Sequence, residues 1–222
     1  GNGMTWGDVK LAALQTMFSN EGEVLTPDDI NQDYINAMPA KANEALQQVA
    51  SVGRPILRSW QVEVAQVDEA QETAEKLVLP AADKAYKVSL SHYLPRFRCI
   101  DRGQVLFDDG AVYDLAEDWR LEGDDVLVLP GMPVGIYTIW YQAYPQTVTR
   151  ETPDSEEIDL APEAVVLLPL YMAAELYKED ELAMATILRN EYEDGLEKLR
   201  QSYEDGGSGL TSGARRNTTG WW

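Results

Sequence analysis

The stretch AVVLLPLYMAAELYKEDELAMATILRNEYEDGLEKL, residues 164–199, decides the fold class. Its first part is apolar on every side, which is typical of a helix buried in the protein or in an interface. Its second part carries one apolar stripe at helical spacing: Leu182, Ala185, Leu188, Tyr192, Leu196, Leu199 and Tyr203. The acidic YKEDE between them, residues 177–181, forms an elbow, so the stretch predicts a helical hairpin. Its expected core positions are Leu167, Leu170, Leu188 and Leu196.

Polar residues 151–160 lead into this hairpin. Asp159 is expected to cap the first helix, because a short acidic side chain can accept hydrogen bonds from free backbone N–H groups. The helix would then begin through Pro162, a residue type favoured in the first helical turn.

Two further helices are predicted near the N-terminus. Thr5 with Asp8 three residues later is close to a capping box and begins the first of them. Thr26 followed by Pro27 is a second start signal. The second helix continues towards residue 53, and Pro39 is expected to kink it or split it in two.

Between residues 54 and 150 the pattern changes from helical to alternating. Turn signals separate the strand-like segments PILRSWQVEVAQV, KLVLP, YKVSLS, RFRCID, QVLFDDGAVYDL, DWRLEGDDVLVLP and GIYTIWYQAYPQTV. Asp109-Gly110 predicts a tight hairpin, because both residue types adopt positive φ at low cost. Residues 123–125 predict a second hairpin between WRLE and VLVLP. Short strands at this spacing are typical of a small antiparallel sandwich or barrel.

The order of helices, strands and helices predicts an α+β fold. Residues 5–53 and 151–204 would form one helical bundle built from both ends of the chain. Residues 54–150 would form a small antiparallel β-sandwich or barrel inserted between them. The glycine-rich residues 205–222 read as a flexible tail.

The charge balance is strongly acidic, with 38 Asp and Glu against 18 Lys and Arg and a formal net charge of −20. Such a body repels nucleic acid and anionic lipid, which argues against a protein that grips DNA. A generally acidic, soluble protein is one interpretation. A surface that lets DNA pass without holding it is the other.

The chain has one histidine, His92, and one cysteine, Cys99. Nothing around His92 marks a catalytic base, so it is expected at the surface or at a strand edge. Cys99 lies in RFRCID and is expected to be a buried, inert thiol. The sequence contains no phosphate-binding glycine motif, nucleophile elbow or zinc-ligand spacing. We therefore expect no catalytic residue, no cofactor and no metal site.

Adjacent carboxylates occur in predicted turns and in the elbow, where solvation and capping are their expected roles. An enzyme that uses such a pair is the alternative. The pairs are Asp108-Asp109, Asp124-Asp125, Glu156-Glu157 and the run at residues 179–181.

The longest apolar run, residues 164–174, contains Pro169 and is well short of the roughly 20 residues that a bilayer demands. No membrane segment is therefore expected. A single cysteine cannot form an internal disulfide, which fits a reducing compartment.

Aromatic residues alternate along the last strand-like segment. Tyr137, Ile139 and Tyr141 share one face by period two, and Trp140 lies on the other. Packing in the core of a small β-domain is the expected role of this stripe. A platform for stacking sugars is the alternative.

The tail differs from the acidic body, because ARRNTTGWW is locally basic and aromatic. Arg215 and Arg216 carry its charge, and Trp221 and Trp222 could supply binding energy in a pocket. It is either a disordered tail or an arm that becomes ordered on a neighbouring subunit or partner.

Taken together, these segments resemble the head-to-tail connector proteins, also called adaptor or neck proteins, of tailed bacteriophages and prophages. The N-terminal similarity covers TWGDVKLAALQTMFS and DDINQDYINAMPAKANEALQQVAS. The C-terminal similarity is a polar lead-in, an apolar helix, an acidic elbow and an N-E-Y/F-E helix. DWRLEGDDVLVLPGMPVGIYTIWYQAYPQTVT resembles the family's β-hairpin region. The C-terminal pattern is carried by Asp154, Glu156 or Glu157, Asp159, Leu160, Pro162, Glu163, Asn190, Glu191, Tyr192 and Glu193.

The resemblance implies a structural virion protein with no catalysis, present in the host cytoplasm during assembly. Such subunits form a ring, usually twelve-fold, under the capsid portal, extend the DNA channel and receive a tail or stopper protein. DNA would pass without specific binding. The expected assembly surface is Leu167, Leu170, Tyr171, Arg215, Arg216, Trp221 and Trp222.

Three other functions compete with this interpretation. A non-catalytic binding module could recognise a carbohydrate or protein through the aromatic face of the β-domain. An acidic mimic of DNA could inhibit DNA-binding enzymes, although this rests on net charge alone. An enzyme using paired carboxylates is the third.

Overall fold

The computed structural model describes residues 3–18, 29–66, 76–79, 86–107, 120–123, 126–129 and 135–204. The chain mixes helices and strands, which confirms the predicted α+β class. It divides into two compact units: Gly1–Arg54 with Pro145–Trp222, and Pro55–Tyr144. Both crossings between the units fall directly before a proline, which favours extended backbone at Arg54 and Tyr144.

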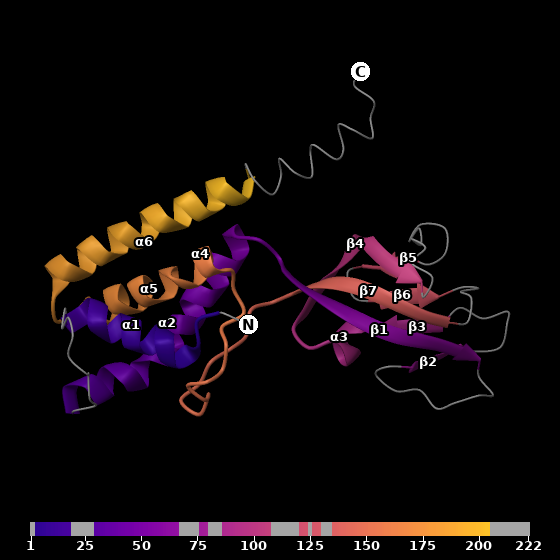
Figure 1. Cartoon of the computed structure of the whole chain (residues 1–222), viewed down its shortest axis with the longest axis horizontal. Coiled ribbons are helices and arrows are strands. Elements are labelled where there is room, and N and C mark those ends of the chain that lie inside the picture. Colours follow the sequence, from indigo (N-terminus) through magenta and orange to yellow (C-terminus); the bar gives the residue numbers. More distant parts are fainter. Residues whose placement is uncertain are drawn as a thin grey trace, which may run out of the picture. The chain divides into compact units, whose positions relative to one another are not determined.

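The helical unit combines both ends of the chain. In Figure 1 the indigo and purple helices from its start lie against the orange and yellow helices from its end. These helices are α1 (Trp6–Phe18), α2 (Asp29–Val52), α4 (Pro162–Val165), α5 (Leu167–Tyr177) and α6 (Leu182–Ser202).

The start of α1 is a capping box, as predicted. The backbone N–H of Asp8 donates to Thr5 Oγ1 at 3.1 Å. In return, the backbone N–H of Thr5 donates to Asp8 Oδ2, also at 3.1 Å. Two backbone donors that a helix start leaves unpaired are thereby satisfied. The predicted cap of the second helix at Thr26 and Pro27 lies outside the described residues.

Helix α2 continues through Pro39 as one element, so the predicted split is wrong. A proline inside a helix removes one hydrogen bond and costs about 3 kcal/mol. Met38 and Ala42 on either side are fully buried, as are Ala45 and Val49 further along the same face. Burying this face against the other helices offsets the cost of the proline.

A backbone strap joins the start of α1 to the polar segment that leads into α4. The N–H of Trp6 donates to the carbonyl oxygen of Glu156 at 2.7 Å. The N–H of Ile158 donates back to the carbonyl oxygen of Met4 at 2.9 Å. Backbone hydrogen bonds therefore join the two segments directly, in addition to the packing of the helices.

The start of α4 differs from the sequence prediction. Pro162 lies in the first turn, as predicted, but the N-cap residue is Ala161 and no side chain caps the helix. Asp159 is therefore not the cap. Its backbone N–H instead donates to Gln146 Oε1 at 2.7 Å. Because Pro162 has no N–H, this helix start has one donor fewer to satisfy.

The predicted hairpin core is largely correct. Leu167 and Leu188 are buried, and the half-buried Leu170 and Leu196 pack against the core. Leu182 was predicted to belong to the apolar stripe but is 67% exposed. It is the first residue of α6, beside the elbow, and its side chain borders a surface hollow between α5 and α6.

The strand unit contains two sheets. A four-stranded sheet has the order β2-β1-β7-β4, and a three-stranded sheet has the order β3-β6-β5. A short helix, α3 (Leu90–Tyr93), ends the segment that was predicted to stay extended to residue 91. The strands are β1 (Ile56–Gln66), β2 (Lys76–Leu79), β3 (Tyr86–Ser89), β4 (Phe97–Phe107), β5 (Arg120–Glu122), β6 (Val126–Leu129) and β7 (Gly135–Ala143).

The predicted all-antiparallel pairing is wrong at one edge. Strand β1 pairs with β7 in antiparallel register but with β2 in parallel register, with Glu63 opposite Lys76. A parallel neighbour requires the chain to return to the same end of the sheet before β2 begins. The sequence pattern of β2 does not distinguish a parallel from an antiparallel neighbour.

The second predicted hairpin is confirmed. Strands β5 and β6 are antiparallel neighbours, with Glu122 opposite Val126. Gly123, which follows β5, has a φ of +64°, a conformation that glycine adopts without strain. The predicted turn at Asp109-Gly110 lies outside the described residues.

Replacing Gly7 by alanine should destabilise the helical unit. A Cβ at Gly7 would lie 2.9 Å from Asp154 Cβ and 3.1 Å from its carbonyl oxygen. We expect Gly7→Ala to lower the free energy of unfolding by about 1–3 kcal/mol, despite the better helix propensity of alanine. Denaturant titration followed by the helical circular dichroism signal measures this change.

The matched control is Gly3→Ala, because a Cβ at Gly3 meets no atom within 4 Å. It should leave the unfolding midpoint unchanged. A Gly7→Ala protein as stable as the original would show that the strap yields without cost.

Candidate functional site

A network of ion pairs and hydrogen bonds lies where α2, α5 and α6 meet, and we call it the Glu175–Arg189 cluster. Each helix contributes side chains at spacings of three or four residues, which project from one face. The members are Lys41, Glu44 and Gln48 from α2, Tyr171 and Glu175 from α5, Lys178 directly after α5, and Arg189, Tyr192 and Glu193 from α6.

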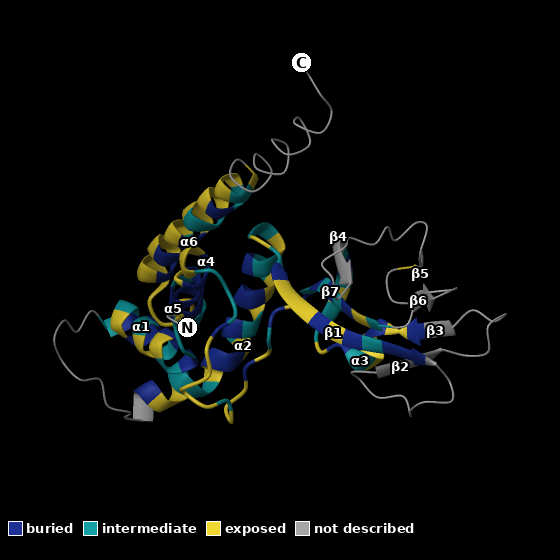
Figure 2. Cartoon of the chain, turned by 45° about the vertical axis from the view of Figure 1, so that its right-hand side comes forward, coloured by how far each residue is buried: buried dark blue, intermediate teal, exposed yellow. Residues whose placement is uncertain are grey.

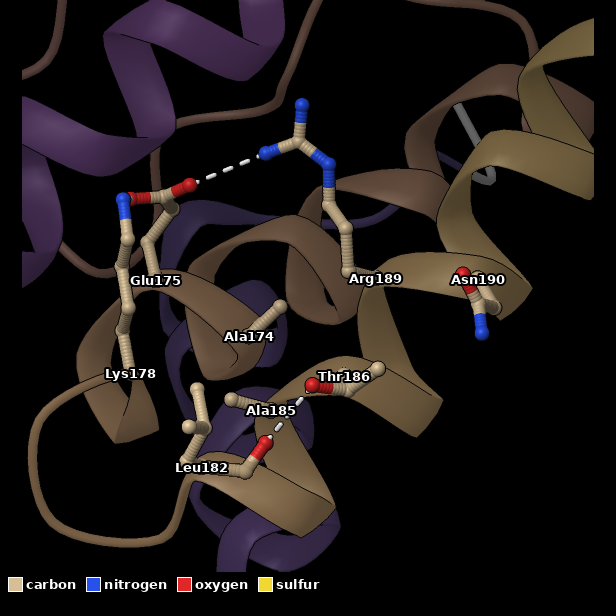
Figure 3. A pocket seen from close by; sticks show the side chains of 8 residues that line it. All are labelled: Ala174, Glu175, Lys178, Leu182, Ala185, Thr186, Arg189 and Asn190. Atoms are coloured by element: carbon tan, nitrogen blue, oxygen red, sulfur yellow. Dashed lines mark hydrogen bonds and ion pairs between the residues drawn. The ribbon is translucent and has the colours of Figure 1, made fainter.

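An ion pair between Glu175 and Arg189 joins α5 to α6 at the centre of the cluster (Figure 3). Arg189 Nη1 lies 2.9 Å from Glu175 Oε1. On the same side chain, Arg189 Nε lies 2.8 Å from Glu193 Oε1. The other oxygen of Glu175 faces Lys178 at 3.8 Å and Lys41 at 4.0 Å. The side chain of Glu175 is only 14% exposed, so these cations compensate a carboxylate with little access to water.

Two buried tyrosines extend the cluster towards α2. The hydroxyl of Tyr171 donates to Glu44 Oε2 at 2.8 Å, and that of Tyr192 donates to Gln48 Oε1 at 2.6 Å. Their rings lie 5.0 Å apart between centroids. The Arg189 guanidinium lies over both rings, at 5.3 and 5.7 Å. These geometries are within the range of cation–π attraction.

Both tyrosines are held in the neutral form. Burial is the main cause, and the hydrogen bond to Glu44 the second, that raises the pKa of Tyr171 to about 12. Burial is also the main cause that raises the pKa of Tyr192 above its ordinary value, and the charges of Tyr171 and Glu193 add to it. A neutral phenol remains a donor, which is what the carboxylate of Glu44 and the amide oxygen of Gln48 require.

The cluster acts as a clamp between helices. Every polar group named above is engaged with another group of the cluster, and no pair is arranged as a nucleophile with an adjacent base. It fixes the rotation of α6 about its own axis, because Arg189, Tyr192 and Glu193 must all face the cluster. The same rotation decides which residues of α6 face outward.

Three aromatic rings pack together next to the elbow of the hairpin. Phe18, Tyr34 and Tyr177 form mutual contacts, with centroids 5.9 to 6.1 Å apart. The Tyr177 hydroxyl donates to the carbonyl oxygen of Met17 at 2.6 Å, and the Tyr34 hydroxyl donates to Asp180 Oδ2 at 2.7 Å. Burial, followed by the bond to Asp180, raises the pKa of Tyr34 to about 12.

A surface hollow of about 200 Å³ opens between α5 and α6 (Figure 3). Its apolar part comes from Ala174, Leu182 and Ala185, and charged side chains line the rest. Its full lining is Ala174, Glu175, Lys178, Leu182, Ala185, Thr186, Arg189 and Asn190. The hollow therefore offers apolar contact next to groups that the cluster already holds in place.

Of the predicted assembly residues, the structure describes Leu167, Leu170 and Tyr171. Leu167 and Tyr171 are buried in the core of the helical unit, and Leu170 is half-buried against it. An interface role for Leu167 and Tyr171 would first require their exposure. The remaining predicted positions, Arg215, Arg216, Trp221 and Trp222, lie outside the described residues.

The aromatic stripe of β7 is a core face, as expected. Tyr137, Ile139 and Tyr141 are all buried, while Trp140 on the opposite face is half-buried. Trp60 of β1 is also buried and stacks on Tyr93 with centroids 6.4 Å apart. Tyr137 and Tyr141 therefore offer no exposed platform on which a sugar ring could stack.

The remaining predicted candidates take ordinary positions. His92 is exposed on α3, as predicted, and Cys99 of β4 is half-buried, less buried than predicted. Glu156 and Glu157 are exposed. Within the described ranges, no group of three or more metal-ligating side chains is found. No described helix has the length and apolar character of a membrane span.

Sequence reasoning missed the Glu175–Arg189 cluster, although a signal was present. Glu175 is the only charged residue between positions 164 and 177. A lone carboxylate in an otherwise apolar helix must find cations when that helix is buried. Arg189 on the following helix is the nearest arginine in the sequence that could form an ion pair with it.

Comparison with models of known protein families and with curated protein sequences finds no match to this chain.

The clamp can be tested with two substitutions that each remove one partner of Arg189. Glu175→Gln removes the shielded pair between helices, and we expect it to lower the free energy of unfolding by about 1–3 kcal/mol. Glu193→Gln removes an exposed pair within α6 and should cost only about 0.3–0.5 kcal/mol. Denaturant titration of both proteins checks the ranking, and equal losses would show that the pair between helices has no special role.

The buried phenols predict a loss of stability at alkaline pH. The unfolded chain releases tyrosine protons near pH 10, whereas folded Tyr171 holds its proton until about pH 12. The folded state therefore binds more protons in this window, so the stabilisation is complete below pH 10 and is lost as pH rises towards 12.

The denaturation midpoint of the original protein should accordingly fall across this pH window. A variant with both Tyr171→Phe and Tyr192→Phe should show a shallower fall, although its stability at neutral pH will be lower. Parallel curves for the two proteins would contradict the assignment.

Proposed function

We propose that this protein is a structural subunit of a ring-shaped connector between the head and the tail of a tailed bacteriophage or prophage. In this proposal the chain is a helical bundle with an inserted β-domain. It binds copies of itself, the portal protein and a tail or stopper protein. It works in the virion after assembly in the host cytoplasm, and it catalyses no reaction.

One observation carries the proposal: the residues behind the connector resemblance are those that close the helical unit. Pro162 of the lead-in begins α4, and Glu156 holds the start of α1 through its carbonyl oxygen. Tyr192, from the N-E-Y-E pattern, is fully buried and bonds to Gln48. The pattern therefore corresponds to a definite architecture, in which both ends of the chain meet around an inserted β unit.

The charge of the chain supports a role next to DNA without a grip on it. A net charge of −20 repels phosphate from the chain as a whole. A channel wall of this composition would let DNA slide during packaging and ejection. A ring built from many such subunits would multiply the repulsion, because each copy adds its own charge.

The first experiment is electron microscopy of lysates from a phage or prophage whose gene for this protein carries a stop codon at Trp6. We expect DNA-filled or leaking heads beside complete, separate tails, because heads and tails assemble independently of a connector. The matched control is the same phage in a host that suppresses the stop codon, where joined virions should return.

Joined, infectious virions without suppression would remove the connector role. Empty heads without packaged DNA, accompanied by normal tails, would place the protein earlier in head assembly and would also contradict the proposal.

A further inference from the structure

Helix α6 begins with an exposed apolar end. Leu182 is 67% exposed, Ile187 54% and Met184 38%. These three residues lie in the first two turns of the helix. Met184 and Ile187 face away from the core, whereas Leu182 lies on the side next to α5, where it lines the hollow. In Figure 2, α6 displays exposed positions along one side and buried positions along the other. We call these three residues the apolar end of α6.

Carboxylates follow the apolar end along the same strip of the helix. Met184, Ile187, Glu191 and Asp194 recur at intervals of three and four residues, which places them in one line. Glu191 and Asp194 are exposed, and in the described part of the chain neither forms an ion pair. Lys198 ends this strip one turn later. From its start to its middle, the outer face therefore changes from apolar to acidic.

The chain after α6 carries the complementary chemistry in the reverse order. Residues 206–222 contain no acidic side chain. Going away from the helix, Arg215 and Arg216 come first, and Trp221 and Trp222 follow. A segment that runs back along α6 would bring the arginines to the carboxylates and the tryptophans to the apolar end.

The lengths permit this path. With a rise of 1.5 Å per residue, Asp194 lies about 15 Å and Leu182 about 33 Å back from residue 204. The ten residues 205–214 can span up to about 33–36 Å, which is more than enough to bring Arg215 to Asp194. The six-residue step from Arg215 to Trp221 spans up to about 20 Å, and the distance from Asp194 to Ile187 is about 10 Å.

The hollow between α5 and α6 continues the apolar end on its other side. Leu182 borders both surfaces, and Ala174 and Ala185 extend the apolar contact into the hollow. Lys178 and Arg189 stand at its edge, where a cation can approach the face of an indole ring. An aromatic side chain at the apolar end could therefore contact the exposed residues of α6 and the lining of the hollow at the same time.

Attachment to the same chain favours this segment over other occupants. A tether of this length holds its end at an effective concentration of about millimolar, well above the concentration of a second copy in solution. Two copies paired through their α6 faces would bring the carboxylates of Glu191 and Asp194 towards the acidic elbow of the neighbour. Repulsion between these charges disfavours that arrangement.

We propose that residues 205–222 fold back along the outer face of α6 of the same chain. Arg215 and Arg216 pair with Glu191 and Asp194. Trp221 and Trp222 cover the apolar end of α6. This contact does not depend on the connector role proposed above.

The test uses the full-length protein and the indole N–H signals of its NMR spectrum, assigned with Trp221→Phe and Trp222→Phe. In the original protein these two signals should differ from those of exposed tryptophan. A variant with both Leu182→Ser and Ile187→Ser should move them to the exposed positions. Leu11→Ser is the matched control, because Leu11 is an exposed apolar residue of α1 and its loss should leave both signals in place.

A charge exchange tests the arginine contacts separately. Arg215→Glu with Arg216→Glu should release the tryptophans, and adding Glu191→Arg with Asp194→Arg should restore their signals. The amide signals of α1, α2 and α5 report whether each variant keeps its fold.

Two results would overturn the proposal. Tryptophan signals at the exposed positions in the original protein would show that the segment does not bind α6. Signals that return to those positions on dilution would show that the contact joins two copies of the chain.

Discussion

The helical unit depends on the need to cover α5 from every side. Most of its eleven residues are buried, and its sequence has no polar face that could meet water. Helices α1, α2 and α6 all contact it, and α1 and α2 precede it by more than a hundred residues. A buried helix of this kind therefore forces both ends of the chain into one unit. The strand region between residues 55 and 144 becomes an insertion as a consequence.

Burial of α5 also explains why one acidic side chain has so large a structural effect. The carboxylate of Glu175 is only 14% exposed, and it faces Arg189 of α6, Lys41 of α2 and Lys178, the residue directly after α5. Apolar packing alone would tolerate small rotations of α6, since leucine side chains have no preferred partner. The directional bonds around Glu175 and Arg189 remove that freedom. The clamp thus converts a non-specific hydrophobic contact into a defined orientation.

Sequence patterns predicted the parts of the fold that depend on local or periodic signals. The capping box at Thr5, the hairpin core and the aromatic core face of β7 are of this kind. Predictions failed where distant residues decide the outcome. Asp159 bonds through its backbone to Gln146 instead of capping α4, and Pro39 is retained because helices far along the chain cover its neighbours. The parallel pairing of β2 and the partners of Glu175 likewise depend on contacts between segments far apart in sequence.

The two sides of α6 have different roles. Its inner side is specified by Tyr192 and Arg189, whose bonds allow one rotation of the helix. That rotation leaves Met184, Ile187, Glu191 and Asp194 facing outward, where they contribute little to the fold. Apolar residues held at the surface by a rigid inner face cannot turn inward to escape water. Covering these apolar side chains would remove them from water, so contact with a partner segment would be favourable without any change in the fold of α6.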